Sequence, residues 1–493
     1  MAQTQSNNLG QRAAQALAWT LLLTLFSKVI SLGGQVVLAW LLAPRAFGLI
    51  GLAYTLTAFT ALLQRAGIRE VLVHRHRRFH LWATPGFWMS LTFGVLTSAV
   101  MLGMAPVLAR VYGEPELVGL IMVLALAAPI NGVASVADAK LQSQLRFGLI
   151  SRVGMLQAIL TMGLTILFAW LGFGAYSFVM PQPIAALFNL VCLWRAADVS
   201  VTGKPRFSCW RYLLSDSLVM LLGSVLIAVI AQGDYFILGL VLDATEVGLY
   251  FFAFNLSIQV ITLFSSQFTR VLFPTLASID DPYRQTEVYL RVSRMLTLAA
   301  MPFAGMQILI ADPLIRLMFD ERWYPAITIF QVLSLATVFR VVSTSAGSLL
   351  QAQGRFKFRL YIFCCYTPIF LAAVYLGTVS RGDAVGAALG VSSFYSVIGF
   401  LHVWLISHKY GGTWKDIVTI YAAPLIATAL SMGIAWLAME QLPDATPIGK
   451  IGCIALGIAL MLPIYVLVAR LLAREIFDEI IQRLMKLVKR KRG

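Results

Sequence analysis

Two basic residues lie near the middle of long apolar stretches of the sequence. Lys28 belongs to the first stretch and Arg340 to a later one. A charge at the centre of a bilayer costs about 2.5–3.5 kcal/mol on the translocon scale. Each residue is about 12 positions, or roughly 18 Å, from either end of its stretch, beyond the reach of a snorkelling side chain. Such charges suit the binding of an anion, to which arginine offers forked donors and lysine a point charge.

Polar residues share the helical face of each cation. They are Ser31, Gly34 and Gln35 beside Lys28, and Thr337, Ser343 and Thr344 beside Arg340. Such stripes predict a water-filled cavity, and its two cations predict an anionic substrate such as a phosphate group. A structural salt bridge is the alternative, for which the acidic residues inside the apolar stretches are Asp138, Asp216 and Asp234.

Three further positions have two readings each. Asp234 is either an ion-coupling carboxylate or a polar residue near a helix end. The segment LQSQLRF at 141–147 recurs as LQAQGRF at 350–356, which makes Arg146 and Arg355 equivalent. We expect these two arginines to anchor their segments at the headgroup level. Contact with the substrate on the cytoplasmic side is the alternative.

No cofactor or metal site is expected. The loop HRHRRFH at 74–80 has the histidines of a metal site, but its arginines favour a basic loop that faces lipid headgroups. The five cysteines have no metal-ligand spacing and imply no disulfide framework. The motifs GxxxxGK[ST] and HExxH are absent from the sequence, so we expect a protein that is not an enzyme and is not driven by ATP.

A very apolar chain carries these residues. Of its 493 residues, 59% are hydrophobic and 12% are charged, and a mean hydropathy of +0.82 indicates a membrane protein. A spanning helix needs about 20 mostly apolar residues. We expect fourteen such helices, near 16–42, 46–66, 85–107, 117–139, 150–171, 174–194, 213–241, 247–273, 289–310, 325–350, 358–378, 384–407, 417–438 and 450–472.

The basic residues predict how the chain is oriented. The net charge of +16 is concentrated in alternate connections and in the C-terminal tail. This is the positive-inside pattern for an even number of helices, so both termini are expected in the cytoplasm. The charge is therefore topological and does not predict a nucleic-acid partner. The amphipathic tail at 473–493 is expected to lie against anionic lipids of the inner leaflet.

An internal duplication predicts the architecture. A shift of 200 places Leu38 on Leu238 and Gly48 on Gly248, and the shift grows to 209 at the repeated LQ segment. The unit is thus six helices, and its two copies are expected to be related by an axis along the membrane normal. The predicted fold is all-α and polytopic, with six-helix lobes at 1–200 and 201–410, two more helices at 411–472 and the tail.

Several stretches resemble a known family. They are LAWLLAPRAFGLIGLAYTLTAF, AGIREVLVHR, DYFILGLVLDATEVGLYFFAFN, FTRVLFPTLASID and DERWYP. Together they look like the polysaccharide-exporter branch, including the Wzx-type flippases, of the multidrug/oligosaccharidyl-lipid/polysaccharide superfamily. The resemblance covers nearly the whole chain. It implies fourteen helices and a location in a bacterial inner membrane.

The resemblance also implies a function. Its substrate is undecaprenyl-pyrophosphate-linked oligosaccharide, moved from the cytoplasmic to the periplasmic leaflet for cell-surface polysaccharide biosynthesis. Alternating access is the expected mechanism, with polysaccharide polymerase and export machinery as further partners. A cation-coupled drug antiporter would favour a cavity lined by carboxylates. A membrane-embedded glycan polymerase or ligase would favour larger outer loops than this sequence predicts.

Overall fold

The computed structural model describes residues 26–65, 72, 79–201, 203, 210, 217–442, 446–474 and 477–478. Within these residues the regular structure is helical. Eleven helices are long and apolar enough to cross a membrane, and Phe26–Leu41 and Val225–Val241 are shorter apolar helices. The prediction of an all-helical membrane protein is confirmed, whereas the count of fourteen spans stays a prediction.

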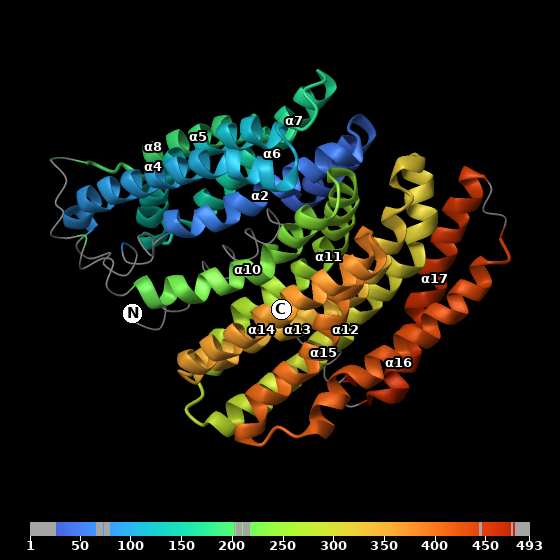
Figure 1. Ribbon diagram of the computed structural model, residues 1–493. Coiled ribbons are helices and arrows are strands. Elements are labelled where there is room, and N and C mark those ends of the chain that lie inside the picture. The colour runs from blue at the N-terminus through green and yellow to red at the C-terminus, as the bar shows by residue number, and fades with distance from the viewer. Residues whose placement is uncertain are drawn as a thin grey trace, which may run out of the picture. The chain divides into compact units, whose positions relative to one another are not determined.

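The chain forms two compact units, Met1–Gly248 and Leu249–Gly493, whose helices are coloured along the chain in Figure 1. In the first unit the helix Phe26–Leu41 precedes α2 (Pro44–Arg65), α4 (Phe79–Tyr112), α5 (Glu116–Ser143), α6 (Phe147–Trp170), the short α7 (Tyr176–Val179), α8 (Pro181–Ala197) and α10 (Ser217–Val241). Helix α5 packs against both α4 and α8, and α6 packs against α8.

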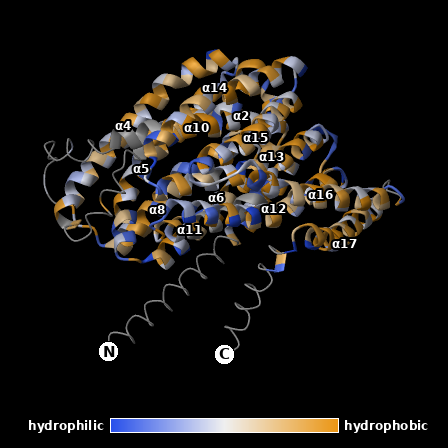
Figure 2. Ribbon diagram, turned by 90° about the horizontal axis from the view of Figure 1, so that it is seen from below, coloured by the Kyte–Doolittle hydropathy of each residue, from blue (hydrophilic) through white to orange (hydrophobic). Residues whose placement is uncertain are grey.

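The second unit contains most of α11 (Ala244–Ala277), then α12 (Pro282–Met318), α13 (Ala326–Ala352), α14 (Phe356–Arg381), α15 (Ala384–Ser407), α16 (Trp414–Met439) and α17 (Pro447–Leu472). Here α13 packs against both α12 and α15, and α14 packs against α15. The same order of packing occurs in the first unit, and the two-lobe architecture stays a prediction. Helices α16 and α17 pack against each other and against α12, and apolar residues run along both (Figure 2).

Local sequence signals fix where several helices begin. The Asp281 carboxylate accepts a hydrogen bond from the Tyr283 N–H, and Pro282 occupies the first position of α12. At the start of α16, Thr413 and Asp416 form a reciprocal capping box. These caps satisfy backbone N–H groups that a helix leaves unpaired, and so they define the connections between the apolar helices.

Candidate functional site

A pocket in the first unit has both polar and apolar residues in its wall, the apolar ones including Ile30, Leu38 and Met162. Its volume is about 420 Å³, and the helix Phe26–Leu41, α2, α6, α7 and α8 contribute to its wall. The polar residues that line it are Ser27, Ser31, Tyr54, Gln157, Thr161, Thr165 and Gln182. All of them are uncharged. The pocket can therefore donate and accept hydrogen bonds without placing a charge in the apolar interior.

Helical spacing explains how this polar wall arises. Gln157, Thr161 and Thr165 are four residues apart and so share one face of α6. The Thr161 hydroxyl donates to the Gln157 carbonyl oxygen and the Thr165 hydroxyl to the Thr161 carbonyl oxygen, both at 2.8 Å. With their protons used in this way, both hydroxyl oxygens keep lone pairs that can accept hydrogen bonds from a ligand.

A glycine lets the first helix approach α6. A Cβ atom added to Gly34 would lie 2.1 Å from the sulfur of Met162, so a larger residue there would require this flexible side chain to move. Ser27 and Ser31 are four residues apart on the same helix and line the pocket. The predicted polar stripe of this helix therefore contributes to a real hollow through Ser31.

Lys28 and Gln35 have different surroundings from Ser31. Lys28 is half-buried, stands beside the pocket-lining Ser27 and is not itself part of the pocket wall. Gln35 is buried, with 9% of its surface exposed. Of the predicted site residues Lys28, Ser31 and Gln35, only Ser31 lines the pocket. Lys28 is next in sequence to Ser27, which also lines it.

Arg340 lies in the second unit at the middle of α13. Its guanidinium carbon is 5.4 Å from the ring centre of Phe254 and 5.4 Å from that of Tyr395. Rings at this distance stabilise a cation through their negative faces. Neither ring is a predicted partner of Arg340. Their helices, α11 and α15, are distant from α13 along the chain, so only the fold brings them together.

Two helical neighbours of Arg340 on α13, Thr337 and Ser343, are buried and carry hydroxyl groups. Thr337 donates to the Ser334 carbonyl oxygen at 2.7 Å. The Ser343 hydroxyl is buried and has no hydrogen-bond partner among the described residues. The side chain of Thr344 lies outside the described part of the structure. The hydroxyl-lined face predicted around Arg340 is therefore present at Thr337 and Ser343.

The structure describes two of the three acidic residues that could pair with Lys28 or Arg340. Asp234 is buried in α10, with 3% of its surface exposed, and accepts a hydrogen bond from the Tyr235 N–H at 3.0 Å. Asp138 accepts a hydrogen bond from the Gln142 side chain at 3.0 Å. Asp216 lies outside the described residues. Both readings of Asp234 stay predictions.

Arg146 and Arg355 occupy the same local geometry in the two units. Arg146 donates to the Ala196 carbonyl oxygen at 2.8 Å, and Arg355 donates to the Ile406 carbonyl oxygen at 3.1 Å. Each acceptor is the second-last residue of its helix, α8 or α15. A cation there satisfies a carbonyl that the helix leaves unpaired.

The backbone before each arginine is also alike. Leu145 has a φ of 58° and Gly354 a φ of 66°, and both lie in the left-handed region that ends a helix. Partial burial lowers the pKa of Arg355 from its ordinary value, although arginine stays charged in proteins. In this structure both arginines contact the protein backbone, and the predictions of headgroup anchoring and substrate contact stay open.

Among the described residues, no group of three His, Cys, Asp or Glu side chains could hold a metal ion. Most of the predicted basic loop at 74–80 and most of the tail at 473–493 lie outside those residues. Four cysteines in the described part, Cys192, Cys364, Cys365 and Cys453, are free thiols.

The chain is similar to known proteins over most of its length. It is 26% identical over 399 residues to the teichuronic acid biosynthesis protein TuaB of Bacillus subtilis strain 168, covering 77% of this chain and 78% of that protein. It is 24% identical over 411 residues to the lipopolysaccharide biosynthesis protein WzxC of Escherichia coli strain K12, covering 78% of each.

Solved structures of transporters share its fold. The lipid II flippase MurJ in an inward closed conformation superposes with a TM-score of 0.72 over 92% of this chain and 99% of MurJ, at 12% identity. An inward-facing multidrug resistance transporter of the MATE family, in the MOP superfamily, gives a TM-score of 0.62 over 78% of this chain and 94% of that one, at 16% identity. At such identities the likeness concerns the fold alone.

The sequence profile of the polysaccharide biosynthesis protein family matches residues 37–328, more than half of the chain. The relatives and the shared fold agree with the resemblance seen in the sequence. The chain belongs to the polysaccharide biosynthesis protein family, within the polysaccharide-exporter branch of the multidrug/oligosaccharidyl-lipid/polysaccharide superfamily.

Proposed function

We propose that this protein is a flippase that moves undecaprenyl-pyrophosphate-linked oligosaccharide from the cytoplasmic to the periplasmic leaflet of a bacterial inner membrane. The observation that carries the proposal is the uncharged pocket of the first unit, in which hydroxyl and amide groups lie among apolar and aromatic side chains. Sugar hydroxyls need donors and acceptors of this kind. Membership of the polysaccharide biosynthesis protein family supports such a substrate.

In this proposal the cations serve the pyrophosphate group. Lys28 follows Ser27, which lines the pocket of the first unit, and the Arg340 guanidinium lies near two aromatic rings in the second unit. Arginine offers forked N–H donors to a phosphate. Ser31 belongs to the sugar pocket, while Gln35 and Thr344 complete the proposed polar faces. Outward movement of an anion is favoured by an inside-negative potential, by about 2.3 kcal/mol per charge per 100 mV.

Transport would proceed by alternating access, with the polyprenyl chain in the lipid phase and both termini in the cytoplasm. Asp234 is the proposed ion-coupling carboxylate, because a carboxylate buried in an apolar helix is a frequent carrier of protons in transporters. A polysaccharide polymerase and export machinery would take up the product on the outer side.

The test uses a strain that lacks the chromosomal gene and carries a plasmid copy. We expect the empty strain to accumulate lipid-linked repeat units whose sugars are on the cytoplasmic side. The variants Gln157→Leu and Thr161→Val remove pocket acceptors at nearly constant volume and should each reduce transfer at least about tenfold, the effect of one lost hydrogen bond to a ligand.

Thr378→Val is the matched control. Its hydroxyl also donates to its own helix, to the Val374 carbonyl oxygen at 2.7 Å, and is fully buried outside the pocket. It should transfer normally. Accumulation of unpolymerised units on the periplasmic side of the empty strain would instead identify a polymerase, and export of cationic dyes without any effect on glycolipids would identify a drug antiporter.

A further inference from the structure

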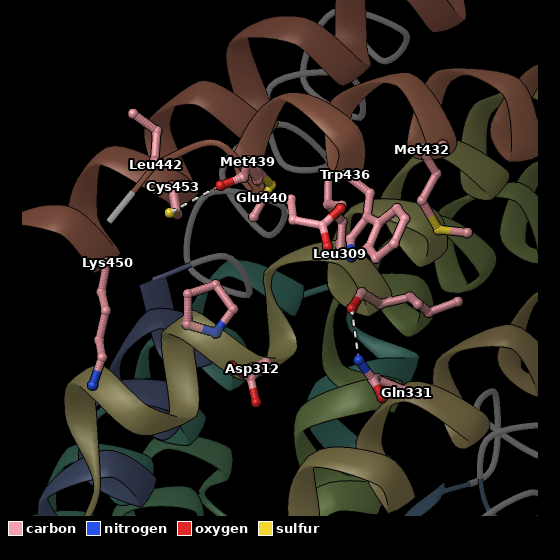
Figure 3. A pocket seen from close by; sticks show the side chains of 13 residues that line it. Leu309, Asp312, Gln331, Met432, Trp436, Met439, Glu440, Leu442, Lys450 and Cys453 are labelled. Carbon is pink, nitrogen blue, oxygen red and sulfur yellow. Dashed lines mark hydrogen bonds between the residues drawn. The ribbon is translucent and has the colours of Figure 1, made fainter. Parts of the chain in front are cut away.

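The second unit has a larger pocket, and charged residues are part of its wall. It has a volume of about 580 Å³ and lies where α12 and α13 meet α16 and α17 (Figure 3). Most of its wall is apolar, with Leu309, Met432, Trp436 and Met439 among the lining residues. Three charged residues, Asp312, Glu440 and Lys450, complete the wall. The pocket therefore suits an amphiphile, with an apolar body and a charged head.

When Arg316 is counted with the three charged residues of the wall, the charges around the pocket sum to zero. The Arg316 Nε atom donates to the Asp312 carboxylate at 2.7 Å, so this carboxylate is neutralised within α12. The Lys450 Nζ atom donates to a backbone oxygen, that of Arg316, at 3.3 Å. Glu440 makes no ion pair in the described part of the chain. One cation and one anion thus stay available for a ligand that carries both signs.

Figure 3 shows these two groups on different sides of the pocket, with Lys450 reaching from α17 at one side and Glu440 beside Trp436 on α16. The arrangement suits a head that carries its positive and its negative charge on different groups. A simple anion would meet Glu440, and a simple cation would meet Lys450. The geometry therefore disfavours ligands with a single charge.

The charged residues of the pocket lie near the ends of their helices. Asp312 is six residues before the end of α12, Glu440 follows the last residue of α16, and Lys450 is in the first turn of α17. Beside it, Trp436 is 54% exposed and Ile448 83% exposed. In a membrane protein such apolar exposure faces lipid, and tryptophan is enriched at the interface. The site therefore opens toward lipid headgroups.

We propose that this pocket binds a phospholipid with a primary amine in its headgroup, with the ammonium at Glu440, the phosphate at Lys450 and acyl chains along the apolar wall. Phosphatidylethanolamine has this chemistry. Its ammonium offers three N–H donors to a carboxylate, whereas the quaternary ammonium of phosphatidylcholine offers none and phosphatidylglycerol has no positive charge. This proposal does not depend on the proposed transport function.

The test measures lipid binding to the full-length, delipidated protein in detergent by native mass spectrometry. Dioleoyl phosphatidylethanolamine should bind at least about tenfold more tightly than the phosphatidylcholine or phosphatidylglycerol with the same chains. Successive N-methylation of the headgroup should weaken binding step by step. Glu440→Gln should abolish the preference for the amine, and Lys450→Gln should weaken phosphatidylethanolamine and phosphatidylglycerol alike.

Glu287→Gln is the control, because Glu287 is an exposed carboxylate near the opposite end of α12. It should bind all three lipids as the wild type does. A second measurement locates the lipid: brominated phosphatidylethanolamine should quench part of the tryptophan fluorescence, and this part should vanish in Trp436→Phe but persist in Trp414→Phe. Equal binding of the three lipids, an unchanged preference in Glu440→Gln, or quenching that survives Trp436→Phe would each overturn the proposal.

Discussion

At the scale of single residues, the aromatic contacts of Arg340 make its replacements informative. Arg340→Ala removes the charge, and Arg340→Lys keeps the charge but loses the planar, forked donors that arginine offers to a phosphate. We expect transfer to fall about 10- to 100-fold in Arg340→Ala, the effect of losing one or two charge-assisted hydrogen bonds. Arg340→Lys should be intermediate, and Lys28→Ala should resemble Arg340→Ala.

The measurement is transfer of the lipid-linked oligosaccharide in complemented cells, normalised to the amount of protein in the membrane. Lys357→Ala removes a cation from the first turn of α14 instead of from the middle of a helix and should transfer normally. If Lys28→Ala and Arg340→Ala both transferred at the rate of the wild type, the assignment of these cations to the pyrophosphate would be abandoned.

Some residues of the candidate site could be predicted from the sequence and others could not. Ser31 follows from helical spacing, because a charge that must be solvated implies polar neighbours on the same face. Gln157 and Thr161 are also four residues apart within an apolar stretch, a spacing from which this polar helix face could have been predicted. The sequence does not predict that Phe254 and Tyr395 lie beside Arg340. Aromatic residues are common in apolar helices, and only the tertiary packing brings these two rings to the arginine.

At the scale of helices, the caps made by Arg146 and Arg355 should contribute to stability. Each joins the start of one helix to the end of another through a charge-assisted hydrogen bond to a backbone oxygen. Arg146→Ala and Arg355→Ala should each lower the free energy of unfolding by about 1.5–3 kcal/mol. Thermal unfolding in detergent would show this as a shift of the midpoint by several degrees.

Arg152→Ala is the control for these caps. Arg152 is an exposed residue of α6 close to Arg146, and a surface change of this kind usually stays within about 0.5 kcal/mol. If the two cap variants unfolded at the same temperature as Arg152→Ala, the hydrogen bonds to Ala196 and Ile406 would have no stabilising role. A loss of transfer at unchanged stability would favour contact with the substrate instead.

Helix lengths show what hydropathy can and cannot predict. The apolar stretch near 289–310 predicted a span, and α12 runs from Pro282 to Met318. The extra turns at its start are polar and follow the cap at Asp281, so they are helical but need not be apolar. Hydropathy identifies the part of a helix that meets lipid. The ends of the helix depend on capping residues and on contact with water, and hydropathy does not predict either.

At the scale of the whole molecule, one contact has the reciprocity that a pseudo-twofold axis requires. A Cβ atom added to Gly48 would lie 1.7 Å from the Ala244 carbonyl oxygen, and one added to Gly248 would lie 1.8 Å from the Pro44 carbonyl oxygen. Positions 44 and 48 are equivalent to 244 and 248 in the predicted duplication. Reciprocal contacts of this kind are a property of twofold interfaces. The pseudo-twofold axis itself stays a prediction.

This crossing leaves no room for a side chain, so Gly48→Ala and Gly248→Ala should each destabilise the protein by about 1–3 kcal/mol, the usual cost of overpacking. Gly103→Ala is the control: no atom lies within 4 Å of its added Cβ, and alanine should stabilise its helix by about 0.5–1 kcal/mol.

Because Gly48 and Gly248 meet at one crossing, a single separation of the two helices should accommodate both added methyl groups. The double variant should therefore cost clearly less than the two single variants together, which a double-mutant cycle of thermal unfolding would measure as a coupling of about 0.5–3 kcal/mol. Strict additivity would mean that the two glycines are strained independently, and the reciprocal contact would then be no argument for a shared axis.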